Sequence, residues 1–299
     1  MRLVTRADWD GLVCAVLLST VEHLDVIQFT SPQEIQSGAA TVPPESVVAN
    51  LPYHPDAALW FDHHVSEAAR GAHVTASFKG KFAPAPSAAR LVFEYYQADE
   101  RLRRFADLLD ATDRFDSAQL TWEDVVAPSG YVLLAYTLDP RTGLQDLDRE
   151  AYFLLLLDWL KTKSVAEILA QPEVRGLTDR LRAEDQAFRA TLQQYSRLDG
   201  NVVITDLRGV AAPPGNRFLI YTLFPQANVS ARLSEDADGQ TATVAVGYSL
   251  FNRTCKTNVG NLLAEYGGGG LVGVGTARFP KAEAEAKFAA IIRRLKEAG

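Results

Sequence analysis

The sequence predicts an α/β protein with an N-terminal parallel-sheet domain, a helical connector and a smaller C-terminal α/β domain. Short β-like runs alternate with helix-like runs in the first third, the middle has helical spacing, and short β runs return after Gly200. A chain of 299 residues is also longer than one compact core usually grows. We therefore expect domains at residues 1–120, 121–198 and 199–299.

The expected strands of the N-terminal domain end at Thr5, Thr30, Asn50 and Asp62. Alternation of strands with helices implies parallel strands joined by crossover helices. Ligands of such sheets bind outside the carboxyl ends of the strands. The side chains expected to converge there are those of Asp8, Asp10, Asn50, Asp62 and His63.

A helix is expected from about Pro86 to Leu109, and the stretch "DATDRFDS" follows it in a loop or at the helix end. Its aspartates suit a solvated turn as well as a site. From Trp122 to about Leu198 the apolar and charged residues have amphipathic spacing, which predicts the helical connector. Short strands and a closing helix after Phe279 complete the C-terminal domain.

Composition limits the classes of partner. The formal charge of -7 argues against a broad grip on long duplex nucleic acid, but it allows a small anionic ligand held by local donors. Cys14 and Cys255 make no disulfide framework and suit a reducing compartment. The start of the chain does not resemble a signal peptide, and no stretch reaches the length of a membrane span. We expect a cytoplasmic protein.

The first candidate motif is "TRADWDGL", which contains Asp8 and Asp10. Two aspartates in a loop between a strand and a helix can aim both carboxylates at one point, which suits a hard divalent cation. The alternative is that Asp10 is the N-cap of the following helix.

The second motif is "LWFDHHVSE", in which Asp62, His63 and His64 follow an apolar strand. A histidine just past a strand can present a ring nitrogen to a metal while a neighbouring carboxylate orients the ring. The alternative is that one imidazole packs inward and the other is solvated. A chance Asp-His-His in a chain with five histidines is rare, so the motif favours a metal site.

The third motif is the glycine run from Gly267 to Gly270. Successive glycines can form a concave nest of backbone N-H groups that holds a phosphate. The spacing of Gly268, Gly270 and Gly273 also fits a dinucleotide fingerprint, but too little chain follows to build the βαβ unit that the fingerprint requires.

Taken in order, "ADWDGL", "FDHH", "DATDRFDS" and "YGGGGLVGVGT" resemble the motifs of the DHH phosphoesterase superfamily with its associated C-terminal domain. RecJ-like nucleases, nanoRNA and cyclic-dinucleotide phosphodiesterases, and exopolyphosphatase-like proteins belong to that superfamily. The resemblance implies a hydrolase with Mn²⁺ or Mg²⁺ in the N-terminal DHH domain and a substrate gripped by the C-terminal domain. Metal ions of this kind polarise a phosphoryl oxygen and activate water.

The resemblance also implies site residues. The implied metal ligands are Asp8, Asp10, Asn50, His63 and Asp113, with Asp116 as the alternative to Asp113. The implied catalytic residues are Arg6, Asp62, His63 and His64. The implied substrate-binding residues are Arg253, Gly267, Gly268, Gly269 and Gly270.

Three positions depart from the family pattern. Arg6 and Leu271 stand where members of the family usually have histidine, and Asn50 stands where they have a bridging aspartate. Arginine does not ligate a cation, and a neutral amide is a poor bridge between two dications. We therefore expect one metal ion, with two as the alternative. His54 is a further hypothesis, as a replacement ligand from the loop after Asn50.

The predicted function is hydrolysis of a phosphodiester or phosphoanhydride bond in a small phosphorylated substrate. A short oligonucleotide, a dinucleotide or a short polyphosphate would suit. The alternative is a catalytically degenerate nucleotide- or phosphate-binding protein, which Arg6, Asn50 and Leu271 motivate. The middle helices or the C-terminal helix could also supply a homodimer contact.

Overall fold

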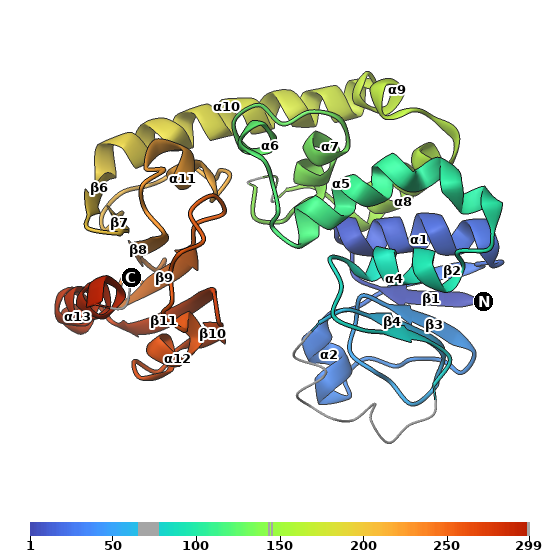
Figure 1. Ribbon diagram of the computed structural model, residues 1–299, viewed down its shortest axis with the longest axis horizontal. Helices are drawn as coiled ribbons and strands as arrows, with labels where there is room; N and C mark the ends of the chain where they lie inside the picture. The colour runs from blue at the N-terminus through green and yellow to red at the C-terminus, as the bar shows by residue number, and fades with distance from the viewer. Residues whose placement is uncertain (65–77, 143, 145, 298–299) are drawn as a thin grey trace. The chain divides into compact units, whose positions relative to one another are not determined.

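The computed structural model describes residues 1–64, 78–142, 144 and 146–297 (Figure 1). The chain forms two compact units. The first comprises Met1–Gln119, Pro128–Pro140 and Leu144–Thr178, and the second comprises Leu120–Ala127, Arg141–Gly143 and Asp179–Gly299. Each unit is described below by itself.

The first unit contains a five-stranded parallel sheet in the order β2-β1-β3-β4-β5. Its strands are β1 (Arg2–Thr5), β2 (Val26–Phe29), β3 (Ser46–Ala49), β4 (Ala57–Asp62) and β5 (Gly80–Phe82). The expected parallel sheet is confirmed, and the first four strands end within one residue of their predicted ends. β3 and β4 are joined by residues 50–56 without a helix, in agreement with the loop expected after Asn50.

Side-chain alternation in the strands sends apolar residues to both faces of this sheet. Leu3, Val47 and Phe61 face a large core with α1 (Trp9–Val21) and α4 (Ala88–Tyr95). Val4, Val48 and Trp60 face the opposite side, where α2 (Pro32–Ser37) contributes Ile35. Figure 1 shows α1 and α4 on one face and α2 on the other. A sheet buried on both faces exposes mainly the ends of its strands to ligands.

The remaining helices of the first unit follow α4 in the chain. They are the 3₁₀ helix η1 (Glu100–Phe105), α5 (Ala106–Asp116), α7 (Gly130–Leu138), α8 (Arg149–Thr162), α9 (Val165–Leu169) and the start of α10 (Pro172–Tyr195). The single helix expected from Pro86 to Leu109 is therefore wrong, because α4 ends at Tyr95 and a new helical segment begins at Glu100. Asp110 and Asp113 lie inside α5 rather than in a loop.

The second unit contains a six-stranded mixed sheet in the order β10-β11-β9-β8-β7-β6, in which only the β7 and β8 pair is parallel. Its strands are β6 (Ser196–Asp199), β7 (Val202–Asp206), β8 (Val229–Glu235), β9 (Thr241–Tyr248), β10 (Gly269–Leu271) and β11 (Val274–Pro280). The expected C-terminal α/β fold is confirmed.

The second unit also contains several helices. They are α6 (Trp122–Val126), the end of α10, α11 (Leu219–Leu223), α12 (Val259–Ala264), the 3₁₀ helix η2 (Lys281–Glu283) and α13 (Ala284–Glu297). Of these, α12 and α13 pack on this sheet. Alternate residues of the central strands, such as Val229 and Val244, form an apolar core with α12 and α13. The Tyr221 hydroxyl from α11 contacts the Ser230 hydroxyl of β8 and donates to the Gly247 carbonyl of β9.

Candidate metal centre

The carboxyl ends of three neighbouring strands bring the predicted polar residues together. Asp8 and Asp10 follow β1, Asn50 follows β3, and Asp62 ends β4 immediately before His63 and His64. The Thr5 hydroxyl donates to the Ala49 carbonyl at 3.0 Å, which ties the ends of β1 and β3. This edge of the sheet is the expected position for a ligand site.

Asp8, and not Asp10, is the N-cap of α1. Its carboxylate accepts from the Gly11 N-H at 3.0 Å. Gly11 is required there, because a Cβ at this position would lie 2.3 Å from the Arg6 carbonyl oxygen. The alternative role of Asp10 as the cap is therefore wrong, and its carboxylate is left for another use.

Asp10 is buried, and backbone N-H groups at the start of α4 hold its carboxylate. Its two carboxylate oxygens accept from the N-H groups of Ala88 at 2.8 Å and Ala89 at 2.9 Å. These groups belong to the first turn of a helix, where N-H groups lack helical partners and the dipole favours a negative charge. The carboxylate is thus fixed in direction before any ligand arrives.

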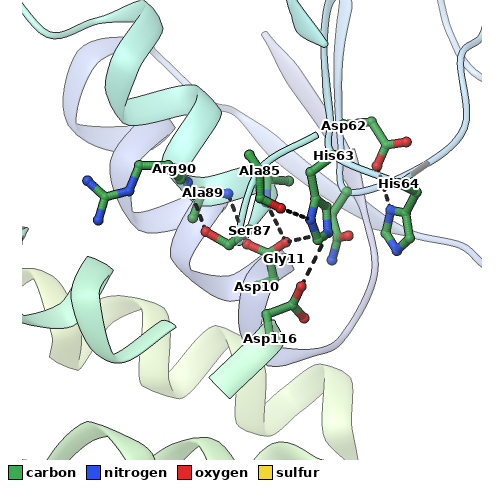
Figure 2. A network of polar contacts seen from close by, with 12 residues as sticks. Asp10, Gly11, Asp62, His63, His64, Ala85, Ser87, Ala89, Arg90 and Asp116 are labelled. Carbon is green, nitrogen blue, oxygen red and sulfur yellow. Dashed lines mark hydrogen bonds and ion pairs between the residues drawn. The ribbon is translucent and has the colours of Figure 1, made fainter. Parts of the chain in front are cut away.

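His63 faces Asp10 and Asp116 with one ring nitrogen (Figure 2). Its Nδ1 lies 3.0 Å from the Ala85 carbonyl oxygen, which can only accept, so the proton sits on Nδ1. Its Nε2 lies 3.6 Å from Asp10 Oδ2 and 3.2 Å from Asp116 Oδ2. The lone pair on Nε2 therefore points at two carboxylates.

Asp116 reaches the group from the last turn of α5. The Trp9 indole N-H donates to the Thr112 hydroxyl at 3.0 Å, and this bond fixes α5 against the start of α1. One ligand atom each from Asp10, His63 and Asp116 lies within 4.8 Å of the others. Ligand atoms around one octahedral Mg²⁺ at about 2.1 Å lie about 3 Å apart when adjacent and about 4.2 Å apart when opposite. The spacing fits one such ion.

The electrostatics of the group also favour a cation. Burial raises the pKa of Asp10, although the hydrogen bonds from the backbone N-H groups of Ala88 and Ala89 partly offset this. Burial, together with repulsion from Asp10 and Asp8, raises the pKa of Asp116 well above its usual range. A dication between these carboxylates would remove the cause of the repulsion.

Several polar atoms near the strand ends are buried and have no hydrogen-bond partner among the residues that the structure describes. They include His63 Nε2, Asn50 Oδ1 and Asp62 Oδ2. Buried polar atoms are normally paired, and an unpaired one needs an explanation. All three can donate electron pairs to a metal, so the donors present at this edge fit a divalent cation.

Hydrogen-bond donors of the protein already contact both oxygens of the Asp8 carboxylate. Arg6 Nε lies 3.0 Å from Asp8 Oδ2, and Asn50 Nδ2 donates to Asp8 Oδ1 at 3.0 Å. Asn50 has a left-handed backbone with a φ of 58° and is almost fully buried. Arg6 and Asn50 are two of the positions that depart from the family pattern, and both contact Asp8.

Asp113 does not join the group with Asp10 and His63. It accepts from the Ser87 hydroxyl at 2.6 Å and from Arg90 Nε at 2.7 Å. Ser87 is the N-cap of α4, so Asp113 holds the helix start that in turn holds Asp10. The structure therefore brings the alternative, Asp116, to the group that could hold a metal ion. Ser87 and Arg90 were missed in the sequence, although "PSAAR" carries the cap signal of a helix start.

The two remaining histidines of interest have different surroundings. His64 Nδ1 lies 2.7 Å from Asp62 Oδ1, so its Nε2 is left for another partner. His54 Nδ1 accepts from the Asp56 N-H at 3.3 Å. Among the described residues, His54 is not part of the group that could hold a metal.

The predicted substrate-binding residues lie in the second unit. Gly267 and Gly268 donate their N-H groups to Ala264 and Leu263 of α12, while Gly269 and Gly270 pair with β11. The N-H groups of the first two are therefore used within the fold, which differs from the expected open nest. Arg253 Nε donates to the Leu250 carbonyl at 3.0 Å, and Leu271 is 66% exposed.

Comparisons with known proteins agree with this fold. No family model and no curated protein matches the sequence. Among solved structures, the pGpG-specific phosphodiesterase PggH from Vibrio cholerae matches with a TM-score of 0.88 and 35% identity, over 100% of this chain and 99% of that chain. RecJ from Thermus thermophilus, in complex with Mn²⁺, matches with a TM-score of 0.58 and 15% identity, over 99% of this chain and 52% of that chain.

The fold and the grouped donors define a metal-dependent phosphoesterase. The chain belongs to the DHH phosphoesterase superfamily, as its 35% identity to PggH over the whole length shows. The degenerate binding protein considered above receives no support from this match.

Among the described residues, no helix is long and apolar enough to cross a membrane.

Proposed function

We propose that this chain is a phosphodiesterase that hydrolyses a short linear dinucleotide of the pGpG type. The observation that carries the proposal is the group of Asp10, His63 and Asp116 in a chain that resembles a pGpG-specific phosphodiesterase along its whole length. Water attacks the bridging phosphorus, the bond to the leaving ribose oxygen breaks, and that oxygen takes up a proton. Each pGpG molecule then yields GMP as its only nucleotide product.

Asp10, His63 and Asp116 would hold one Mn²⁺ or Mg²⁺ ion, and Asn50 Oδ1 and Asp62 Oδ2 are further donors at the same edge. When bound, such an ion polarises a phosphoryl oxygen and makes water a nucleophile near neutral pH. Ala85 fixes the proton of His63 on Nδ1, and the start of α4 fixes both oxygens of Asp10.

A single ion is favoured because Asp8 is already neutralised by the protein. Its carboxylate contacts Arg6, Asn50 and the Gly11 N-H, and a carboxylate that bridged a second ion would have to give up these contacts. Arg6 then supplies a fixed positive charge beside the site. Such a charge stabilises the negative charge that develops on the phosphoryl oxygens.

His64 and the second unit complete the proposal. Asp62 accepts the Nδ1 proton of His64, which fixes the ring and leaves Nε2 to contact a phosphoryl oxygen. The first unit is the metal-binding catalytic domain. The second unit binds the substrate, with Arg253 and the segment Gly267–Gly270 as its candidate contacts. The net charge of -7 favours a small substrate over a long nucleic acid.

The test is hydrolysis of pGpG by metal-free protein supplied with Mn²⁺, with GMP measured by chromatography. We expect turnover by the unaltered protein and a loss of about 10³-fold or more in His63→Ala, since a metal ligand is removed. His23→Ala is the matched control, because His23 is 91% exposed in its side chain and lies outside the group.

Short oligonucleotides and short polyphosphate are assayed in parallel. If the protein with Mn²⁺ leaves pGpG intact and cleaves one of these, the proposed substrate is wrong while the phosphoesterase class stands. If His63→Ala retains full activity, the proposed site is wrong.

A further inference from the structure

An exposed aromatic pair stands out in the second unit. Trp122, the first residue of α6, lies with its ring centroid 5.4 Å from that of Phe251 at an interplanar angle of 40°. Trp122 is 39% exposed. The two residues are far apart in the chain, yet both belong to the second unit. A partly exposed indole beside a second ring offers an aromatic face on which a flat ring of a ligand can stack.

Trp122 is held in place from both ends of its short helix. Thr121 caps α6 and exchanges hydrogen bonds with Asp124 in a capping box. Val125 is buried, and α6 contacts α11 of the same unit. The indole is therefore presented from a fixed backbone and is not a side chain on a free loop.

The loop that carries Phe251 is fixed by its own polar side chains. The Ser249 hydroxyl accepts from the N-H groups of Phe251 at 3.2 Å and Asn252 at 3.1 Å. The Asn252 amide donates to the Gln226 carbonyl at 2.9 Å and accepts from Thr254 at 2.8 Å. A loop fixed in this way loses little conformational entropy when a ligand binds.

A guanidinium group stands on the same loop, two residues after Phe251. Arg253 Nε donates to the Leu250 carbonyl at 3.0 Å, which anchors the side chain to the turn. An aromatic face stacks on a nucleobase whatever its sequence, and a guanidinium group attracts a phosphate. An aromatic pair and a guanidinium group, with Phe251 and Arg253 on the same loop, match the chemistry of a nucleotide.

We propose that Trp122 and Phe251 form a stacking subsite for a purine base of the phosphorylated substrate. This inference rests on the proposed function and adds the part of the substrate that the second unit recognises. The base stacks on the exposed indole, Phe251 supports the indole from the side, and Arg253 attracts the phosphate that belongs to the stacked nucleotide. The subsite lies wholly within the second unit.

The experiment measures the Kd of pGpG by calorimetry, with Ca²⁺ in place of Mn²⁺ to suppress hydrolysis. The second ligand is an analogue with the same sugars and phosphates but no bases. We expect Trp122→Ala to weaken pGpG binding about tenfold or more and to leave binding of the base-free analogue unchanged. Trp122→Phe should restore most of the affinity, because it keeps an aromatic face.

Two further variants control for folding and for general loss of an aromatic residue. Phe251→Leu keeps an apolar side chain but removes the ring, and it should weaken pGpG binding less than Trp122→Ala does. Tyr195→Ala removes another exposed aromatic residue of the second unit, and it should leave both affinities unchanged. Urea unfolding of each variant, with the transitions of the unaltered protein, shows that the fold of the second unit is intact.

The outcomes separate this inference from the proposed function. Equal affinity of Trp122→Ala and the unaltered protein for pGpG would overturn the subsite, and so would equal losses for pGpG and the base-free analogue. If the unaltered protein binds GMP or AMP but not pGpG, and Trp122→Ala loses that binding, the subsite stands and the proposed substrate falls. If it binds no nucleotide at all, both are wrong.

Discussion

The candidate metal centre of the first unit and the proposed stacking subsite of the second unit, formed by Trp122 and Phe251, are built in opposite ways. At the metal centre, Asp10 and Asp62 are almost fully buried, and hydrogen bonds fix the ligand side chains themselves. In the second unit, Trp122 and Arg253 are exposed, and most of the fixed groups are those of the supporting backbone. Charges that gather around a cation must be oriented in advance, whereas stacking needs only an accessible face on a rigid support.

The largest effect is expected at the buried side of this comparison. Asp10→Asn replaces a charged ligand with a neutral amide, so Mn²⁺ binding by calorimetry should be lost and kcat/KM for pGpG should fall by about 10³-fold or more. Asp107→Asn, on the exposed surface of α5, is the matched control and should change neither quantity. Normal metal binding by Asp10→Asn would remove Asp10 from the site.

A second test separates two aspartates on the same helix. Asp116→Asn should lower Mn²⁺ affinity by about 10-fold or more, since it removes a proposed ligand. Asp113→Asn should keep the metal stoichiometry but lower the free energy of unfolding by about 1–3 kcal/mol, since it weakens the bonds to Ser87 and Arg90. Calorimetry and urea unfolding measure the two quantities. The reverse pattern would restore Asp113 as the ligand.

The glycine run of the second unit offers a test by matched substitutions. A Cβ at Gly268 would lie 2.1 Å from the Thr276 carbonyl oxygen, whereas a Cβ at Gly269 has nothing within 4 Å. Gly268→Ala should therefore lower the free energy of unfolding by about 3 kcal/mol, and Gly269→Ala by less than about 0.5 kcal/mol. Equal effects in urea unfolding would show that close packing of the hairpin is not what requires Gly268.

Adding metal should also shift the thermal stability of the first unit. Mn²⁺ at about 100 times its Kd should stabilise the first unit by about 2.7 kcal/mol, because it binds the folded unit and not the unfolded chain. For a unit of this size, the Tm should rise by about 5–10 °C. Scanning calorimetry should show no such rise in Asp10→Asn. A rise that persists in this variant would place the metal elsewhere.

Local pattern was enough to predict the strand ends and the residues that follow them. Asp8, Asp10, Asn50, Asp62 and His63 were expected at one edge, because parallel strands all end on the same side of the sheet. The structure brings them there, and this needed no knowledge of how the helices pack. The break between α4 and η1 was missed, because helical spacing continues through it.

Details that depend on contacts between distant segments were not available from the pattern. The N-H groups of Gly267 and Gly268 donate to carbonyls of α12, and no local pattern predicts these hydrogen bonds. The same is true of Trp122, which the sequence places in the connector and the structure places against Phe251. Both depend on which element packs beside which.

The sequence by itself determined that an acidic, histidine-bearing site forms at the carboxyl ends of the first strands. Only the tertiary structure decided which aspartate of α5 enters that site. Asp113 and Asp116 are three residues apart and share one side of the helix, so periodicity does not separate them. Ser87 and Arg90 bind Asp113, the Trp9 to Thr112 bond sets the position of α5, and Asp116 is therefore the carboxylate that meets His63.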